Sequence, residues 1–356
     1  MMYGSKAARR YGYSSARVKV MQSRLLSKKA VDDIANAKDV ESVVSILFNS
    51  DLKKELEEFG GLGIPAEMID FALSKNMAKN ITKLISIAPT TERKLVRSIV
   101  GKWALYNIKL AIEAKDKRKD FDSIARYIVD IGRYDSSAIK EAMREESIEG
   151  LLGKFMINSP YYPILKEALD TYKGTRSAIE AIAAIDKAYY RNLRSILMPL
   201  RQLSNESALL VKMEIDMKNI LTLIRGKRLG MKFSDMDSML LESGRFSKKA
   251  LEQAYTDSKD AAELASHLKE MNLAQAADEY KGSKTKQLLT FEIAMKSSIF
   301  NSAVRTLSHS ILSFGTILAY SYMKEIEIYT LRILINGRLY GLSKEETAKL
   351  ISWRKE

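Results

Sequence analysis

Apolar residues recur at helical spacing close to the start of the chain. Over residues 13–26, three apolar side chains follow one another at steps of three and four, which is the spacing of one face of an α-helix. They are Val18, Met21 and Leu25. Ser14 or Ser15 stands where the N-terminal cap of such a helix would lie. The pattern predicts an amphipathic helix that begins at these serines.

A second stretch, residues 214–225, has apolar residues around more than half of the helical circumference. They are Ile215, Met217, Ile220, Leu221 and Ile224. A helix with apolar residues on most of its sides is buried on most of its sides. We therefore expect residues 214–225 to lie in the interior.

Residues that break helices are scarce along the chain. There are five prolines, none after Pro199, and 17 glycines in 356 residues, too few for a fold of many short strands and turns. Much of the remainder is Ala, Leu, Lys, Glu and Met, which favour helices. With 46% apolar and 29% charged residues, the chain has an ordinary globular composition and is long enough for more than one core. The predicted fold class is all-α.

The end of the buried helix is the most conspicuous part of an internal repeat. Its three copies are YNIKLAIEAK at 106–115, KNILTLIRGK at 218–227 and YTLRILINGR at 329–338. They align without gaps at spacings of 112 and 111 residues, with Asn107, Asn219 and Thr330 in one column. A period of this length indicates one structural unit used three times.

Two further sets of segments recur at similar spacings, 108 and 112 residues for the first set and 108 and 113 for the second. The first set is LLSKKAVDDI at 25–34, RYDSSAIKEA at 133–142 and RFSKKALEQA at 245–254. The second is DVESVVSILF at 39–48, SIEGLLGKFM at 147–156 and DAAELASHLK at 260–269, each with Ser or Asp placed as a helix cap. The copies are colinear, so we predict three similar helical domains at 1–120, 121–232 and 233–356.

The N-terminal segment concentrates the positive charge of the chain. The formal net charge is +14, and the first 30 residues carry eight cations and no acid. These cations are Lys6, Arg9, Arg10, Arg17, Lys19, Arg24, Lys28 and Lys29. They indicate either a solvated helix face or an anionic partner, such as nucleic acid, lipid head groups or an acidic protein face. Nucleic acid is the weaker interpretation, because zinc-ligand spacing, a basic region leading into heptads and an aromatic platform on a strand are all missing from the sequence.

The segment 306–323 resembles a membrane span only in its lack of charge. It contains several Ser and Thr residues, His309 and Gly315, and it falls short of the roughly 20 mostly apolar residues that a bilayer requires. We expect a buried helix pair that is broken near Gly315. The chain has no cysteine and no export signal at its start, which favours the cytosol.

Candidate catalytic chemistry is sparse. His267 and His309 lie far apart in the sequence without metal-ligand spacing, and the phosphate loop of nucleotide-binding proteins does not occur. GLGIPA at 61–66 fits a dinucleotide-binding pattern, but it follows a helical stretch and contains Pro65, so a turn between helices is the better interpretation. We expect no cofactor and no metal.

The cations at the ends of the repeated helices are the candidate binding residues. Arg225, Lys227 and Arg228 surround Gly226, and Arg338 follows Gly337. A left-handed glycine cap and favourable interaction with the helix dipole would explain this pattern in any protein. The functional interpretation is that cationic helix ends gather on one rim and contact a partner.

Three segments of the chain closely resemble the C subunit of the archaeal A-type ATP synthase, the counterpart of the d subunit in V-type ATPases. They are YGYSSARVKVMQSRLLS at 11–27, MEIDMKNILTLIRGKRLG at 213–230 and ILAYSYMKEIEIYTLRILINGRLYGLSKEE at 317–346. The resemblance extends from about residue 8 to residue 350, and its most specific residues are Glu214, Asp216, Asn219, Gly226, Lys227, Glu325, Glu327, Thr330, Gly337 and Arg338. The chain departs from the family in having Phe314-Gly315-Thr316 in place of a Gly-Pro pair and Thr330 in place of Asn.

The resemblance implies a fold and a role. Members are all-helical and funnel-shaped, with three similar domains about a pseudo-threefold axis. They sit on the membrane proteolipid ring and receive the central-stalk axle, so that they pass rotation between head and ring for proton or sodium transport. The resemblance therefore implies a monomeric, non-catalytic subunit, one copy per complex, at the cytoplasmic face of the cell membrane. A contact with anionic lipid is a further expectation from the basic surface.

Two other classes of function remain open at this point. A basic helical scaffold that binds nucleic acid would lose affinity steeply with added salt. An all-α enzyme would have to assemble a site from Glu214, Asp216, Glu325 and Glu327. Their i, i+2 spacing points the two acids of each pair to different helix faces, which argues against a shared site.

Overall fold

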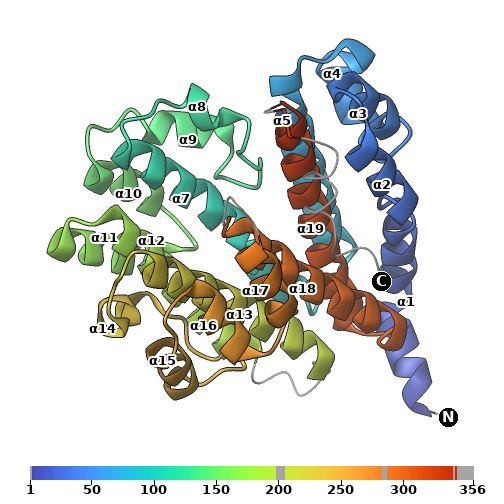
Figure 1. The fold of residues 1–356 in the computed structure, drawn as a ribbon. Helices are drawn as coiled ribbons and strands as arrows, with labels where there is room; N and C mark the ends of the chain where they lie inside the picture. The colour runs from blue at the N-terminus through green and yellow to red at the C-terminus, as the bar shows by residue number, and fades with distance from the viewer. Residues whose placement is uncertain (1, 198–204, 283–286, 340, 343–356) are drawn as a thin grey trace.

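The computed structural model describes residues 2–197, 205–282, 287–339 and 341–342, and in these the chain forms helices and no strands (Figure 1). The prediction of an all-α fold is therefore confirmed for the described residues. The end of the third predicted domain, residues 343–356, lies outside them. The described residues contain no helix with the length and hydropathy of a transmembrane span.

The helices of the N-terminal third are followed by those of the middle and C-terminal thirds. The first are α1 (Met2–Gln22), α2 (Lys28–Asn36), α3 (Val40–Leu47), α4 (Lys53–Glu58), the 3-10 turn η1 (Gly61–Gly63), α5 (Ala66–Ile87), α6 (Arg93–Val100) and α7 (Lys102–Asp116). The next are α8 (Asp122–Ala125), α9 (Ser136–Ala142), α10 (Ile148–Met156), α11 (Tyr162–Thr175), α12 (Ala178–Leu197) and α13 (Asn205–Arg228). The last are α14 (Phe233–Met236), the 3-10 turn η2 (Asp237–Met239), α15 (Lys248–Thr256), α16 (Ala261–Leu268), α17 (Leu273–Gly282), α18 (Leu289–His309) and α19 (Phe314–Leu339).

The order of helices recurs with the period of the sequence. Three short helices and then two long ones occur as α9 to α13 and again as α15 to α19. The first third has the same order, except that its second long helix is divided into α6 and α7 at Gly101. A side chain at this glycine would meet the Tyr161 hydroxyl and backbone carbonyls of α6. The long helices α5, α12 and α18 begin at residues 66, 178 and 289, at the spacings of the repeat.

The predicted caps of the short helices are confirmed in each copy of the second repeated segment. The side chains of Asp39, Ser147 and Asp260 accept hydrogen bonds from backbone N–H groups in the first turns of α3, α10 and α16. Ser27, Asp135 and Ser247 cap α2, α9 and α15 by accepting from Ala30, Ala138 and Ala250. Such caps satisfy N–H groups that the helix itself leaves unpaired.

The N-terminal helix differs from its prediction. α1 begins at Met2, so Ser14 and Ser15 lie inside it and do not cap it. Ser14 is buried and donates a hydrogen bond to the Ile87 carbonyl at 2.7 Å. Packing against the end of α5 therefore explains this serine. The predicted apolar face is confirmed for Val18 and Met21, which are buried in the core, whereas Leu25 lies beyond the end of α1 and is half-buried.

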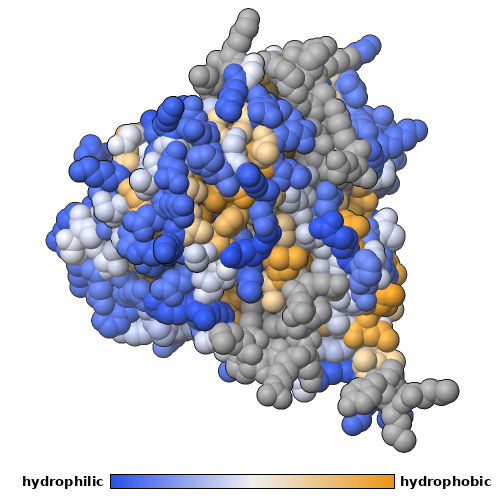
Figure 2. Space-filling model, turned by 60° about the horizontal axis from the view of Figure 1, so that its bottom comes forward, coloured by the Kyte–Doolittle hydropathy of each residue, from blue (hydrophilic) through white to orange (hydrophobic). Residues whose placement is uncertain are grey.

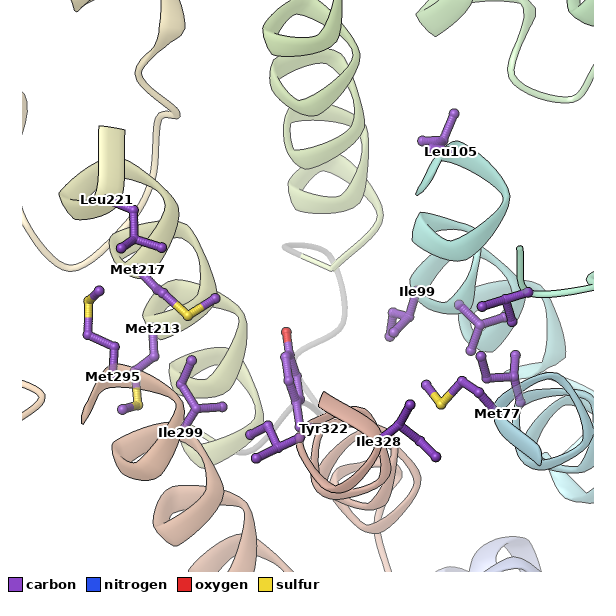
Figure 3. Close-up of a cluster of buried hydrophobic side chains, with 14 of the residues drawn as sticks. Met77, Ile99, Leu105, Met213, Met217, Leu221, Met295, Ile299, Tyr322 and Ile328 are labelled. Carbon is purple, nitrogen blue, oxygen red and sulfur yellow. The ribbon is translucent and has the colours of Figure 1, made fainter. Parts of the chain in front are cut away.

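The other local expectations agree with the structure. GLGIPA forms η1 and the turn that connects α4 to α5. The segment 306–323 is divided between the end of α18 and the start of α19, with the break between His309 and Phe314. Of the methionines in the region drawn in Figure 3, Met77, Met213, Met217 and Met295 are buried in the core, where methionine commonly fills gaps.

The second long helices lie at the centre of the fold. α7 packs on α9 and α10, α13 packs on α14 and α16, and α19 packs on α3 and α5. Each of α7 and α13 is therefore covered by short helices that follow it in the sequence, whereas α19 returns to helices near the N-terminus (Figure 1). The two ends of the chain are joined in one body through α19, which also packs on α1.

Candidate functional site

The three repeated helices meet through one column of the repeat. Lys102 on α7, Glu214 on α13 and Glu325 on α19 occupy equivalent positions, because they are separated by 112 and 111 residues. Lys102 Nζ lies 2.9 Å from Glu214 Oε1 and 2.6 Å from Glu325 Oε2. One cation thus joins two carboxylates from two other helices, and the three helices are held together directly at this level.

Tyr322 completes the contact between α13 and α19. Its hydroxyl donates to Glu214 Oε2 at 2.5 Å, and Lys102 Nζ lies 4.6 Å from its ring centroid. Figure 3 shows this side chain on α19 pointing into the space between α13 and the α6–α7 pair. We call Lys102, Glu214, Glu325 and Tyr322 the central cluster.

The charges of the central cluster stabilise one another. Burial alone would lower the pKa of Lys102, but the charges of Glu214 and Glu325 outweigh it and raise this pKa. Burial would raise the pKa of Glu214, yet the charge of Lys102 and the hydrogen bond from Tyr322 outweigh it and lower this pKa. Both groups therefore carry their charge at neutral pH, and Glu214 is poorly suited to proton transfer there.

A cavity of about 240 Å³ adjoins the central cluster. Its lining comes mainly from one face of each repeated helix, together with residues of α12 and α18; the repeated-helix residues include Leu105, Tyr106, Lys109, Lys218, Ile328, Tyr329 and Arg332. Leu105, Met217 and Ile328 form the next column of the repeat, one turn from the central cluster, and all three are buried (Figure 3). The space between the repeated helices is thus bordered by charged groups and, one turn away, by buried apolar side chains.

Two lysines in this cavity share one carboxylate. Asp186 on α12 lies 2.6 Å from Lys109 Nζ and 3.1 Å from Lys218 Nζ. Burial would raise the pKa of Asp186, but the charges of Lys218 and Lys109 outweigh it and lower this pKa to about 2. Burial lowers the pKa of Lys109. Asp186 therefore connects α7, α12 and α13 through charge.

The remaining acids of the rival enzyme hypothesis point elsewhere. Asp216 Oδ1 accepts the Arg245 N–H at 2.8 Å, in the loop before α15. Glu327 Oε1 accepts the Leu26 N–H at 2.6 Å, in the equivalent loop before α2. The prediction that Glu214 and Asp216, and likewise Glu325 and Glu327, face different sides of their helices is confirmed.

The two asparagines of the Asn/Thr column hold the loops before α9 and α15. Asn219 donates to the Leu241 carbonyl at 2.8 Å and accepts from the Leu241 N–H at 2.7 Å. Asn107 makes the same pair of bonds with Val129, which is also 22 residues further along the chain. Thr330 donates to the Ile326 carbonyl within its own helix. The residue 22 positions after Thr330 is residue 352, which lies outside the described residues.

The outer ends of the repeated helices are alike in all three copies. The N–H groups of Lys119, Met231 and Leu342 donate to the carbonyls of Ala114, Gly226 and Gly337 at 2.8, 3.0 and 2.9 Å. Each preceding residue is left-handed: Arg118 (φ 54°), Gly230 (φ 68°) and Gly341 (φ 76°). This is the hydrogen-bond pattern of a Schellman motif.

The predicted positions of the left-handed glycine caps were wrong by four residues. Gly226 and Gly337 lie inside α13 and α19, and the left-handed glycines are Gly230 and Gly341. A side chain at residue 226 would collide with Met236, so packing against the next helix explains this glycine. At Gly226 and Gly337 the missing side chain therefore allows a close approach of Met236 and Leu342, and neither glycine is left-handed.

The helix-end cations divide into two kinds. Lys115 Nζ donates to the Met143 carbonyl at 2.9 Å, and Arg338 donates to the Ala35 carbonyl. Lys227 lies over the Tyr255 ring, 4.2 Å from its centroid. These three equivalent cations therefore each contact the end of a neighbouring short helix: α9, α2 and α15. Arg225 and Arg228, by contrast, are exposed.

The two histidines make local contacts and lie in different helices. His267 Nδ1 lies 3.0 Å from the Ser258 hydroxyl, and His309 Nδ1 lies 2.8 Å from the Arg305 carbonyl. Each is near the end of its own helix, α16 or α18. The structure therefore does not bring them together.

Lys102 and Asp186 of the candidate site were not predicted from the sequence. The sequence does contain a signal for Lys102, because this residue lies one repeat period before Glu214. The column contains Lys, Glu and Glu, so it does not stand out in the sequence as a repeat of like residues. Asp186 has no such signal, because only the packing of α12 against α7 brings it to its lysines.

Nearly the whole chain is similar to proteins of one known family. Residues 14–350 match the family model of the ATP synthase (C/AC39) subunit. The chain is 24% identical to the C subunit of the A-type ATP synthase of Thermoplasma acidophilum, over 95% of this chain and 97% of that one. It is 27% identical to the corresponding protein of Methanococcoides burtonii, over 96% and 94%, and 26% identical to that of Archaeoglobus fulgidus, over 97% of both.

Proposed function

Because the chain belongs to the ATP synthase (C/AC39) subunit family, we propose that it is a non-catalytic central-stalk subunit. In this role it is a socket that joins the rotating axle to the membrane proteolipid ring of an A-type or V-type complex. The coupled process is the transport of protons or sodium ions. The chain acts as a single copy, bound peripherally at the cytoplasmic face of the membrane.

The central cluster is the observation that supports this proposal most strongly. A socket that transmits rotation must resist twisting of its parts against one another. In this chain, Lys102 ties α7 to α13 and α19 by two short ion pairs in a largely buried setting. Separating buried partners leaves uncompensated charges, which costs about 3–5 kcal/mol. Together with close-packed helices, this resists relative motion of the three repeated helices.

The repeat supports a threefold, funnel-shaped arrangement. The helix order, the Schellman motifs and the central cluster each use equivalent positions from the three thirds of the chain. In Figure 1, α7 and α19 approach one another near the centre of the molecule and diverge from there. We infer that the helices diverge from the central cluster and that the axle enters between them. The three domains would be the predicted 1–120, 121–232 and 233–356, with α19 closing onto the N-terminal helices.

The exposed helix-end cations are the proposed partner contacts. Arg225 and Arg228 are exposed, whereas Lys227 contacts Tyr255 on the neighbouring short helix α15. Lys227 and Arg338 contribute less to binding in this proposal, because each already contacts its own fold.

The experiment that tests the proposal is reconstitution of the complex. We expect the full-length chain to bind purified central-stalk subunits and, separately, the detergent-solubilised proteolipid ring. Complexes assembled without the chain should hydrolyse ATP but fail to pump ions into vesicles, and adding the chain should restore pumping. Ion pumping in the absence of the chain, or failure to bind either partner, would contradict a socket role.

A further inference from the structure

The first half of α1 extends beyond the body of the protein. The second half is fixed by Tyr11, which donates to Glu92 at 2.9 Å, by Ser14, and by Lys19, which donates to the Leu307 carbonyl at 3.3 Å. These contacts place α1 beside the start of α6 and the end of α18. In the sequence, α6 is followed by α7, and α18 is followed by α19. The residues before Arg10 then continue past the end of α18 (Figure 1).

This part of the surface is positively charged. Lys6, Arg9, Arg10 and Lys19 are exposed. Among the described residues, the acids near α1 and the turn after it include Glu92, which pairs with Arg10, and Asp51, which lies 3.9 Å from Arg24. Asp130 lines the same pocket as Arg17 and Asp51. For Lys6, Arg9 and Lys19 the described residues provide no ion pair. Their charge is therefore available to an anionic partner.

Apolar side chains are exposed beside these cations. Ile311 and Leu312, on the turn between α18 and α19, are 53% and 38% exposed. Tyr13 and Val20 on α1 are 67% and 45% exposed. Figure 2, which brings the bottom of Figure 1 forward, shows apolar surface on the side where α1 and α18 lie. Aliphatic and aromatic side chains next to lysine and arginine suit the boundary between lipid head groups and acyl chains.

We propose that α1 and the α18–α19 turn form a surface that binds anionic lipid head groups. This inference deepens the proposed function, on which it rests for the position of the chain at the membrane. Lys6, Arg9 and Lys19 attract the head-group phosphates, while Ile311, Leu312 and Tyr13 reach the interface. A polynucleotide partner explains the cations but gives no role to the aliphatic pair on the turn.

Vesicle binding by the full-length chain tests this inference. Sedimentation with vesicles of mixed phosphatidylglycerol and phosphatidylcholine should exceed sedimentation with phosphatidylcholine alone, and added salt should reduce the difference. The variant Lys6→Glu/Arg9→Glu should bind the anionic vesicles at least about 25-fold more weakly, since each of the two surface cations contributes about fivefold and reversal also adds repulsion. The matched control is Lys119→Glu/Lys173→Glu, which reverses one exposed cation just after α7 and another on α11 and should bind like the parent.

The apolar part has its own pair of variants. Ile311→Ser/Leu312→Ser should weaken vesicle binding several-fold, whereas Ile157→Ser/Ile179→Ser, which changes two exposed residues elsewhere, should not. Circular dichroism of each variant checks that the helices remain.

The outcomes separate this inference from the proposed function. Loss of vesicle binding with intact binding to detergent-solubilised ring and stalk supports the lipid surface. Equal binding by both charge-reversal variants, or no preference for anionic vesicles, overturns it even if the chain proves to be the socket. Loss of ring binding without any change in vesicle binding also overturns it, because the surface would then belong to a protein contact.

Discussion

Equivalent residues of the three repeated helices play the same part at the outer ends but are chemically different at the centre. At their outer ends, equivalent positions do equivalent work: the same hydrogen bonds close α7, α13 and α19, and Lys115, Lys227 and Arg338 each contact the end of a neighbouring short helix. At the centre, equivalent positions are chemically different, with Lys102 facing Glu214 and Glu325. The repeat is thus preserved in the contacts of the outer helix ends and lost in the residue types at the centre.

Electrostatics explains the difference. An outer end touches only its own neighbourhood, so the same residue can serve three times. At the centre the equivalent side chains touch one another, and three lysines or three glutamates would place like charges together in a buried setting. With one lysine and two glutamates in the column, both carboxylates pair with the same cation.

The third repeated helix extends this comparison to the ends of the chain. The loops before α9 and α15 follow α7 and α13 in sequence, and Asn107 and Asn219 hold them. The loop that α19 contacts precedes α2, and Glu327 holds it through the Leu26 N–H. The N-terminal segment therefore supplies to α19 what the other repeated helices obtain from the chain that follows them.

The largest expected effect comes from removing the central cation. In the variant Lys102→Met, Glu214 and Glu325 lose their shared partner, and we expect a loss of about 3–5 kcal/mol in the free energy of unfolding, because two largely buried carboxylates are left uncompensated. Urea unfolding followed by circular dichroism measures this change.

A matched variant decides whether charge pairing is the cause. In Lys102→Met/Glu214→Met/Glu325→Met the whole column is apolar, and we expect stability within about 1–2 kcal/mol of the parent, since well-packed apolar residues often replace buried ion pairs at little cost. If the triple variant is as unstable as the single one, the column acts through its shape and the electrostatic comparison fails.

A somewhat smaller effect is expected at Asp186, with a distinctive pH dependence. Its pKa is lowered from the ordinary 3.8 to about 2, so its charge stabilises the fold above about pH 4, and this contribution disappears as the pH falls toward 2. Asp186→Asn should destabilise the fold by about 3 kcal/mol at pH 7, because Lys109 and Lys218 lose their carboxylate. The difference from the parent should shrink between pH 4 and pH 2. A constant difference across that range would show that the lysines do not depend on this charge.

The Asn/Thr column offers a test of intermediate size. Asn219→Ala removes two buried hydrogen bonds and leaves the Leu241 N–H and carbonyl unpaired, which should cost about 1–3 kcal/mol. Thr330→Val keeps the shape of its side chain and removes one bond within a helix, so it should cost less than about 1 kcal/mol. Chemical denaturation compares the two directly, and equal losses would mean that the loop contact at Asn219 adds nothing.

The smallest effect on stability should come from the exposed helix-end cations. Arg225→Glu/Arg228→Glu should change the free energy of unfolding by no more than about 0.5 kcal/mol, because both side chains are exposed. The same variant should weaken binding to the axle or the ring. Arg338→Met is the comparison, since it leaves the Ala35 carbonyl without its donor and should cost about 1 kcal/mol of stability. Unchanged partner binding in the double variant would reduce Arg225 and Arg228 to surface charges.

Local patterns in the sequence predicted much of what the structure contains. The helical class, the caps at Asp39, Ser147 and Asp260, and the break near Gly315 all depend on residues within a few positions of one another. The two local errors have physical reasons. Ser14 resembles a cap but packs against Ile87, and Gly226 resembles a helix end but makes room for Met236. A short polar or small residue suits both situations, and only the neighbours distinguish them.

The sequence by itself determined that one unit occurs three times and that its second long helix is buried, because period and hydrophobic pattern are properties of the chain alone. Only the tertiary structure decided that Lys102 meets Glu214 and Glu325, that Asp186 is shared by two lysines, and that α19 is completed by the N-terminal helices. The members of the central cluster lie about a hundred positions or more apart in the sequence, as do α19 and the N-terminal helices. Asp186 and its two lysines lie on three different helices. Their energies depend on distance and burial, which the order of residues does not specify.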